Sequence, residues 1–487
     1  FHSLGLAILR EHGSAAGLHR GFRVAGEVER AAALGEALGF SPRKVASLLR
    51  LVSKAKCREA PIGGAAAEAL AAYQQVMTLR NWIDFDDLVA LAVRLLESDV
   101  ELARHYRERF RWIAVDEFQD VDEQQYRLLT LLAARDGNLS VIGDPNQAIY
   151  GFRGADATCF ARFAADYPST TVVALGRNYR SSGTIVAASA QVIAASPESR
   201  PLAAVVREMH ERIAIHAAAT EAAEAEFAVA TIERLIGGHS FFSIDSGRAA
   251  DAAKANLSFA DFAVLYRTDA QSAAFVEAFA RSGMPFKKSS HEPLAASPAV
   301  QAILAALNAA SGDSELSARL AAAAERLRRS GDGPEGAALE TAYQRLATLA
   351  EAAACQGRPF ADAVALAAEA DFWDPRADRV SLLTLHAAKG LEFAVVFIAG
   401  LEDGLLPLHW NGLDEAAGAE ERRLLYVGMT RAKDRLILSR AVKRLWRGRV
   451  QSLAPSPFLA DIESELVKHQ HSDAVRRKPG ERQLKLF

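Results

Sequence analysis

Short apolar runs with helical segments between them constrain the fold of this chain more than any other feature. The runs are Trp112–Val115, Leu139–Ile142, Thr171–Leu175, Phe262–Tyr266, Val380–Thr384, Val395–Ile398 and Arg435–Leu438. Buried parallel strands have this continuous apolar character, and helices connect them. We therefore predict an α/β protein with two parallel-sheet lobes.

Helical, alanine-rich segments interrupt both lobes. Over residues 4–110 apolar side chains recur at intervals of three and four, which predicts mostly helix. We divide the chain into a first lobe at 1–165 with a helical insertion at about 10–80, a second lobe at 166–284 and 379–460, a small helical subdomain at 285–378, and a basic tail at 461–487. We expect no regular structure from His469 up to the last five residues.

Composition narrows the class of protein. The 487 residues are 50% hydrophobic and 24% charged, with a formal charge of −3, so any nucleic-acid surface must be a local patch. Three distant cysteines argue against a disulfide framework or a metal knuckle. No run of about 18 apolar residues occurs, and no charged segment leads into an apolar one at the start. We expect a soluble, cytoplasmic protein without a membrane partner.

Two adjacent carboxylates, Asp116 and Glu117, follow the run Trp112–Val115. Ligands of open α/β sheets bind at the carboxyl ends of strands. There one carboxylate can hold Mg²⁺ through its waters, while its neighbour orients the water that attacks the γ-phosphate of ATP. The alternative is an acidic helix start that complements the helix dipole.

The next run leads into a loop with an amide, two aromatic side chains and an arginine. Gln147 can report on the γ-phosphate, and Tyr150, Phe152 and Arg153 can hold single-stranded bases by stacking and cation–π contact. Aromatic residues near a turn are also common in hydrophobic cores, so core packing is the alternative for Tyr150 and Phe152.

Asp116–Asp120 and Gly143–Gly154 together resemble motifs II and III of the UvrD/Rep/PcrA group of superfamily-1 DNA helicases. Five further segments resemble motifs of that group in the same order: Phe1–Ser3 (Ib), Leu175–Ser181 (IV), Leu265–Ser272 (IVa), Thr384–Phe393 (V) and Glu421–Ala432 (VI). The resemblance spans residues 1 to about 460. It implies two RecA-like lobes with ATP and Mg²⁺ as ligands.

The resemblance also implies roles at the nucleotide. Arg180 and Arg431 would neutralise charge on the γ-phosphate, a task that suits the guanidinium group. Tyr179 would stack on adenine, and Glu392 would accept a hydrogen bond from the ribose. Without the resemblance, an ordinary surface ion pair is the alternative for each arginine.

Four more residues are candidates for contact with DNA. His2 lies in the segment similar to motif Ib, and His386 and Lys389 follow an apolar run in a segment similar to motif V. Arg267 is a candidate phosphate contact, although Asp269 stands where relatives commonly have asparagine. A structural role is the alternative for His386.

The sequence also departs from the group. No Gly-x-x-x-x-Gly-Lys-Ser/Thr occurs, so the loop that cradles the β- and γ-phosphates is missing, as are the adenine-reading glutamine segment and motif Ia. We expect that a longer polypeptide has been truncated, leaving the first lobe incomplete, and that this chain alone hydrolyses ATP poorly.

Two basic features remain near the end of the chain. Around Trp446 lie Arg440, Lys443, Arg444, Arg447 and Arg449, which can track DNA phosphates on a hairpin or form a solvated edge. The terminal residues Gln483, Leu484, Lys485, Leu486 and Phe487 resemble the peptide by which bacterial replication and repair proteins bind the sliding clamp. A merely apolar end is the alternative.

We therefore predict an ATP-dependent translocase or helicase on single-stranded DNA and its junctions with duplex, acting in bacterial repair or replication at the nucleoid. The resemblance implies 3′ to 5′ movement. The alternative is a catalytically incomplete chain that binds DNA and a clamp. A helicase–nuclease subunit lacks support, because no carboxylate and lysine cluster follows the segment similar to motif VI.

Overall fold

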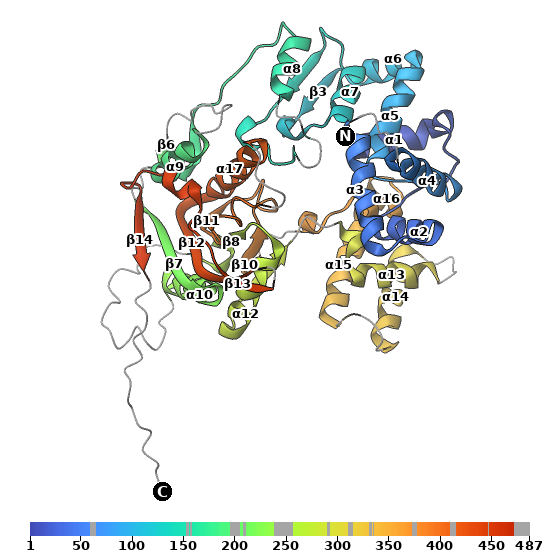
Figure 1. Ribbon diagram of the computed structural model, residues 1–487. Helices are drawn as coiled ribbons and strands as arrows, with labels where there is room; N and C mark the ends of the chain where they lie inside the picture. The colour runs from blue at the N-terminus through green and yellow to red at the C-terminus, as the bar shows by residue number, and fades with distance from the viewer. Residues whose placement is uncertain are drawn as a thin grey trace. The chain divides into compact units, whose positions relative to one another are not determined.

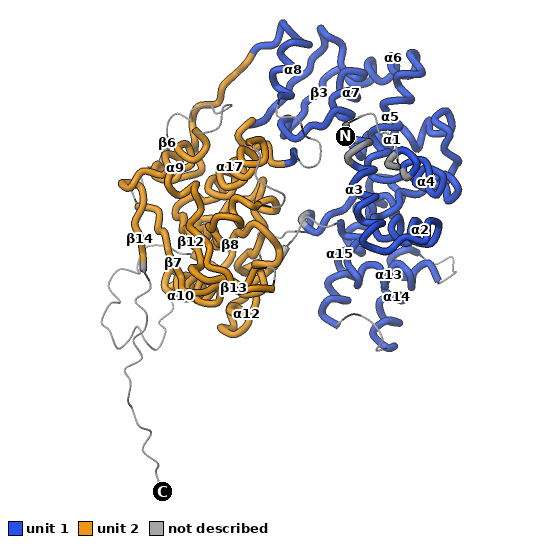
Figure 2. Tube along the Cα trace, viewed as in Figure 1, with its two compact units in different colours: residues 1–144, 150–171, 291–373 blue, residues 145–149, 172–290, 374–487 orange. Residues whose placement is uncertain are grey.

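A computed structural model shows two compact units (Figure 2). Unit 1 comprises residues 1–144, 150–171 and 291–373, and unit 2 comprises residues 145–149, 172–290 and 374–487. The structure describes residues 1–58, 65–151, 155, 158–194, 205–207, 211–237, 257–289, 293–309, 315–330, 334, 336–372, 377–409, 415–446 and 448–471.

The amino-terminal part of unit 1 is helical, as the periodicity predicts. Its helices are α1 (His2–His12), α2 (Glu27–Leu38), α3 (Pro42–Arg58), α4 (Ala65–Leu79), α5 (Asp87–Ser98) and α6 (Val100–Arg109). Two short strands, β1 (Arg23–Val24) and β2 (Trp82–Ile83), pair in parallel between them. Helices α1, α5 and α6 share a core around Ile8, Val93 and Tyr106.

A strand–helix–strand unit carries the acidic pair of unit 1. Strand β3 (Trp112–Val115) pairs in parallel with β4 (Asn138–Val141), and α7 (Glu123–Leu132) connects them. These two strands confirm the sequence prediction. Helix α8 (Cys159–Asp166) covers the strand ends through Phe163, which packs edge-on against Phe118.

The helical insertion after residue 290 belongs to unit 1. It consists of α13 (Pro298–Asn308), α14 (Leu316–Ser330), α15 (Gly336–Cys355) and α16 (Phe360–Leu366), packed around a common apolar core. Helix α16 binds the amino-terminal helices, since Asp362 accepts two hydrogen bonds from Arg10, at 3.0 and 2.5 Å. Leu366 packs in the same region against the cluster of Leu6, Leu9 and Phe22.

Unit 2 is built on one large sheet. Within the described residues its strands follow the order β14–β7–β12–β11–β8–β10–β9, all parallel, with β13 antiparallel to β12. Their bounds are β7 (Ile213–Thr220), β8 (Phe262–Tyr266), β9 (Phe286–Ser289), β10 (Val380–Thr384), β11 (Phe393–Ile398), β12 (Ala432–Trp446), β13 (Arg449–Ser452) and β14 (Val467–His471). A separate pair, β5 (Asn178–Ser182) and β6 (Val205–Arg207), is also parallel.

Helices cover both faces of this sheet (Figure 1). Helices α10 (Glu221–Ile236) and α12 (Ser272–Ser282) pack on the face that includes Val395 and Phe397. Helix α17 (Glu415–Met429) covers the opposite face, where an added Cβ at Gly428 would lie 3.1 Å from Ile398. Helix α9 (Gly183–Ala194) packs beside α17. Two-sided cover explains the continuous apolar runs of β8, β10 and β11.

Two sequence expectations about strands are wrong. Thr171–Leu175 has strand-forming composition but lies in no regular structure, and Val172, Val173 and Leu175 are 70–83% exposed. No strand of the described part pairs with this run, so its β-propensity alone does not make it a strand. His469 was expected to begin an irregular tail, yet residues 469–471 belong to β14, which pairs with β7.

No helix in the described part of the chain is both long and apolar enough to cross a bilayer.

Candidate functional site

Asp116 and Glu117 lie directly after β3 and are exposed to solvent. The Asp116 carboxylate accepts a hydrogen bond from the Glu117 main-chain N–H at 2.9 Å. Glu117 has a positive φ of 52°, an uncommon backbone conformation for a residue with a Cβ that recurs at functional sites. The turn therefore presents two carboxylates at the carboxyl end of a strand, in the position predicted from the sequence.

Gln119 orients this turn, and the sequence analysis did not identify it. It is buried, its amide donates to the Glu117 carboxylate, and its carbonyl accepts from the Asp144 main-chain N–H at 3.0 Å. Gly143 makes the approach possible, because a Cβ there would lie 2.2 Å from the Gln119 side-chain oxygen. The ends of β3 and β4 are thereby joined through one amide side chain.

The donor set at Asp116 suits a magnesium ion that travels with a nucleotide. Mg²⁺ is usually held by one or two carboxylates, with waters and phosphate oxygens as the other ligands. Among the described residues, no group of three or more His, Cys, Asp or Glu side chains could enclose a metal by itself.

Gln147 lies in the short segment that belongs to unit 2, within the 3₁₀ turn Pro145–Gln147. Its side-chain oxygen accepts from Arg431 at 3.3 Å, and its main-chain oxygen accepts from Lys389 Nζ at 2.9 Å. Arg423 Nε donates to the neighbouring Ala148 carbonyl at 2.8 Å. Three basic side chains of unit 2 thus hold the two residues that follow Asn146.

Arg431 is only 2% exposed and lies between α17 and β12. Besides Gln147, its guanidinium donates to the carbonyl of Val427 at 3.0 Å and to that of Leu391 at 3.4 Å. These neutral partners fix the orientation of the side chain. A buried, oriented guanidinium is suited to stabilise phosphate charge.

Arg180 and Lys433 both bind the Glu392 carboxylate. Arg180 Nε lies 2.7 Å from one carboxylate oxygen of Glu392, and Lys433 Nζ lies 2.7 Å from the other. The hydrogen bond from Lys433, followed by that from Arg180, holds the pKa of Glu392 below its usual range. Tyr179 precedes Arg180 on β5 and is 65% exposed. The structure therefore brings Arg180 and Glu392 together. The exposed ring of Tyr179 is next to Arg180 in the sequence.

The candidate DNA residues of unit 1 include one aromatic stack. The rings of His2 and Phe85 lie 3.8 Å apart between centroids and 27° from coplanar, and Phe85 is 40% exposed. The sequence analysis did not identify Phe85, although its place between Asp84 and Asp86 is unusual for a core residue. Tyr150 is half-buried, and Phe152 and Arg153 lie outside the described residues.

The remaining candidates of unit 2 are held by protein partners. Arg267 forms a two-pronged ion pair with Glu421, at 2.6 and 2.9 Å, and Glu421 also accepts from the Leu408 main-chain N–H. His386 is half-buried in the turn after β10, and Lys389 in the same turn donates to Gln147. Asp269, the departure noted in the sequence, pairs with Lys288 at 2.8 Å.

Arg444 does not belong to an exposed basic cluster, which corrects part of the expectation for the segment around Trp446. It is 3% exposed and forms ion pairs with Glu224 of α10 and with Glu402, which lies 2.8 Å away. Burial works against its charge, but the two carboxylates raise the pKa of Arg444 above its usual range. Arg447 and the terminal residues Gln483–Phe487 lie outside the described residues.

Comparison with known proteins matches almost the whole chain. The UvrD/REP helicase N-terminal domain matches residues 1–168, and the UvrD-like helicase C-terminal domain matches residues 173–332 and 344–443. The ATP-dependent DNA helicase PcrA of Leuconostoc citreum is 28% identical, with 99% of this chain and 77% of the relative covered. The same helicase of Bacillus subtilis (strain 168) is 28% identical, with 99% and 78% covered.

Among solved structures, the C-terminal domain of a possible DNA helicase from Lactobacillus plantarum is 14% identical, with 60% of this chain and 98% of that chain covered. The TM-score of this comparison is 0.28, which is too low to indicate a shared fold.

Proposed function

This chain belongs to the UvrD-like family of DNA helicases, and from that membership we propose that it is the ATP-hydrolysing part of a translocase that moves 3′ to 5′ on single-stranded DNA. Repair or replication is the proposed setting. The contact between Arg431 and Gln147 carries the proposal, because it joins a buried guanidinium to the amide that would report on the γ-phosphate.

We assign the nucleotide chemistry to two sets of residues in one hydrolysis cycle. Asp116 would hold the Mg²⁺ that accompanies ATP, which supplies charge neutralisation at the phosphates when bound. Glu117 would orient the attacking water and accept its proton, in a conformation kept by Gln119. Arg431 would stabilise the charge that develops on the phosphate.

Arg180, Tyr179 and Glu392 form the second set. Glu392 has a lowered pKa and therefore stays ionised at neutral pH, so it can accept a hydrogen bond from a ribose hydroxyl beside its two cations. Tyr179 is exposed enough to stack on adenine. These roles rest on the resemblance together with the contacts described above.

DNA contact is proposed for His2, Phe85, Tyr150, Phe152 and Arg153. Stacked rings and a guanidinium give sequence-tolerant contact with bases, as translocation requires. Lys389 would couple the nucleotide to these residues through the Gln147 carbonyl, and a nucleotide-driven shift of residues 147–149 would change the position of Tyr150.

Direction and turnover are tested on a polypeptide that contains residues 1–487 together with a phosphate loop. DNA-stimulated ATP hydrolysis, and faster displacement of streptavidin from the 5′ than from the 3′ end of a biotinylated oligonucleotide, are the expected results. Displacement from the 3′ end only would reverse the proposed polarity, and absence of DNA stimulation would overturn the proposal.

A second candidate is a DNA- and clamp-binding chain without hydrolysis. The observation that favours it is the lack of Gly-x-x-x-x-Gly-Lys-Ser/Thr in the 487 residues. Binding of single-stranded DNA with equal affinity in the presence and absence of Mg²⁺ and ATP would support this candidate over the first.

A further inference from the structure

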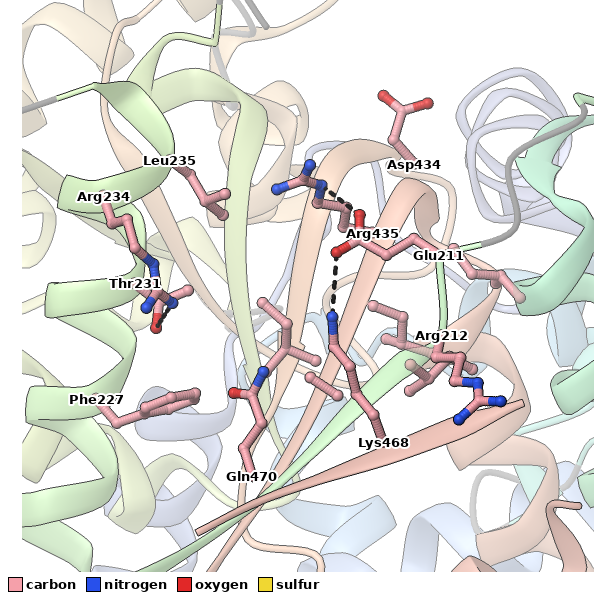
Figure 3. A pocket seen from close by; sticks show the side chains of 15 residues that line it. Glu211, Arg212, Phe227, Thr231, Arg234, Leu235, Asp434, Arg435, Lys468 and Gln470 are labelled. Carbon is pink, nitrogen blue, oxygen red and sulfur yellow. Dashed lines mark hydrogen bonds and ion pairs between the residues drawn. The ribbon is translucent and has the colours of Figure 1, made fainter. Parts of the chain in front are cut away.

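A pocket of about 260 Å³ lies at the amino-terminal ends of β7, β12 and β14, next to the last turns of α10 (Figure 3). Polar and charged side chains dominate its wall: Glu211, Arg212, Thr231, Arg234, Asp434, Arg435, Lys468 and Gln470. No residue assigned above to ATP or DNA lines it. Its volume is below the roughly 300–1,000 Å³ of pockets for drug-sized ligands, which favours a small group.

Strand register brings two cations of this pocket onto one face of the sheet. Ala214 of β7 pairs with Ile437 of β12 and with Lys468 of β14. Arg435 lies two residues before Ile437 on β12, and side chains two residues apart on a strand point to the same face. Arg435 and Lys468 therefore share that face, on the two strands that flank β7, whereas Arg212 points away from them (Figure 3).

Helix α10 covers that same face and adds a third cation. Ala214 belongs to the core that includes α10, and His216, next on that face of β7, stacks on Phe227 of α10 at 3.6 Å. Arg234 lies in the last turn of α10 and donates to the uncharged Thr231 hydroxyl at 3.3 Å. Among the described residues, neither Arg212 nor Arg234 forms an ion pair.

One carboxylate stands between the other two cations. Glu211 lies 2.9 Å from Arg435 Nε and 3.4 Å from Lys468 Nζ, and Figure 3 shows it reaching toward both. With Asp434 the wall holds two carboxylates against four cations, whereas the whole chain carries a net charge of −3. Like charges on neighbouring strands destabilise a sheet, so a bound anion would relieve repulsion here.

We propose that this pocket binds a phosphate group, with Arg234, Arg435 and Lys468 as its ligands. Guanidinium groups match phosphate oxygens with two parallel hydrogen bonds, which a small polar pocket can exploit. Glu211 occupies the place between Arg435 and Lys468 that a phosphate oxygen would take, and so it limits affinity. The phosphate comes either from a nucleic-acid backbone or from a free phosphate compound.

The experiment titrates the full chain with pyrophosphate by calorimetry and with fluorescein-labelled oligothymidylate by anisotropy over a series of salt concentrations. Arg234→Gln and Arg435→Gln are each expected to weaken binding about tenfold, the loss of one charge-assisted hydrogen bond. Glu211→Gln is expected to strengthen it several-fold. Arg281→Gln and Glu277→Gln make the same charge changes on the exposed side of α12 and serve as controls.

The two arms separate the sources of phosphate. Changes confined to oligothymidylate, with the salt slope reduced by about 0.7 per lost contact, identify the nucleic-acid backbone. Changes in pyrophosphate affinity identify a free compound. The proposal is overturned if neither probe responds to Arg234→Gln, which alters an exposed side chain, or if Glu211→Gln and Glu277→Gln change affinity equally.

Discussion

The Arg431 guanidinium donates to the Gln147 side-chain oxygen at 3.3 Å, although the two residues are 284 positions apart in the sequence. The same glutamine offers its main-chain oxygen to Lys389 at 2.9 Å. One residue therefore receives both the arginine that the resemblance assigns to the γ-phosphate and the lysine that is a candidate for contact with DNA. The proposed link between nucleotide and DNA runs through residues 147–149.

The first prediction concerns the rate of ATP hydrolysis, by the chain alone and by variants of Glu117 and Arg431. The 487-residue chain alone is expected to hydrolyse ATP slowly, because it lacks the lysine and main-chain amides of a phosphate loop. In a polypeptide that includes such a loop, Glu117→Gln and Arg431→Ala should each lower kcat by ~10³-fold or more, with DNA affinity unchanged within about twofold. Rapid DNA-stimulated turnover by the chain alone, lost in Glu117→Gln, would contradict the expectation.

The stack of His2 on Phe85 gives a prediction for DNA binding. Phe85→Ala is expected to weaken binding of oligothymidylate by roughly 1–3 kcal/mol, as for loss of one stacked base, and Phe152→Ala by a similar amount. Fluorescence anisotropy at fixed salt measures both. Leu79→Ala removes an 85%-exposed apolar side chain from α4 and is the control. Equal affinities of all three variants and the wild type would assign Phe85 to packing alone.

Replacement of the buried Arg444 is expected to lower the stability of the fold and not the affinity for DNA. Arg444→Ala leaves Glu224 and Glu402 without their cation, which should lower the free energy of unfolding by about 3–5 kcal/mol. Arg449→Ala, an exposed change on β13, should cost within about 0.5 kcal/mol. Urea unfolding compares the two. Similar stability of both variants would show that Arg444 is not essential to the core.

The raised pKa of Asp122 is expected to make the stability of the fold depend on pH. Burial raises the pKa of Asp122 to about 6, despite hydrogen bonds from main-chain N–H groups, and the nearby Asp86 carboxylate adds to the rise. The folded state then binds a proton that the unfolded state has released, so stability falls as pH rises from about 4 to 6, by roughly 2–3 kcal/mol. Asp122→Asn keeps the cap on α7 and should flatten this decline.

Thermal unfolding between pH 4.5 and 7 measures the effect. Asp99→Asn makes the same change at the exposed N-cap of α6, whose side chain also accepts a main-chain N–H, and is the matched control. A wild-type profile that persists in Asp122→Asn would contradict the prediction.

The terminal peptide predicts binding to a bacterial sliding clamp. If Gln483–Phe487 docks in an apolar pocket, Leu486 and Phe487 should be its anchors, with Gln483 and Leu484 contributing and Lys485 tolerant of change. Affinity should be modest, because an unattached peptide loses entropy on docking. Titration of a peptide of the last residues against the clamp tests this. Binding that is indifferent to Leu486→Ala with Phe487→Ala would show an apolar end only.

Local sequence determined much of the sheet and the placement of the acidic pair. Residues 262–266 and 380–384 are strands because parallel strands under helices on both faces bury nearly every side chain and so favour apolar residues. Residues 112–115 also form a strand, which pairs with β4 although Trp112 is exposed. Asp116 and Glu117 then fall at a strand end by chain continuity alone. The resemblance added the order of the motifs, and the family comparison agrees with it.

Tertiary structure alone decided which charged residues are buried and which apolar runs pair. Arg444 is sequestered by Glu224, 220 positions away. Thr171–Leu175 stays exposed because no strand of the described part pairs with it. Lys468 and Arg435, from strands on either side of β7, both bind Glu211. The physical reason is that an ion pair, a strand pairing or a pocket depends on groups far apart in the chain, whereas propensity and periodicity report only on neighbours within a few residues.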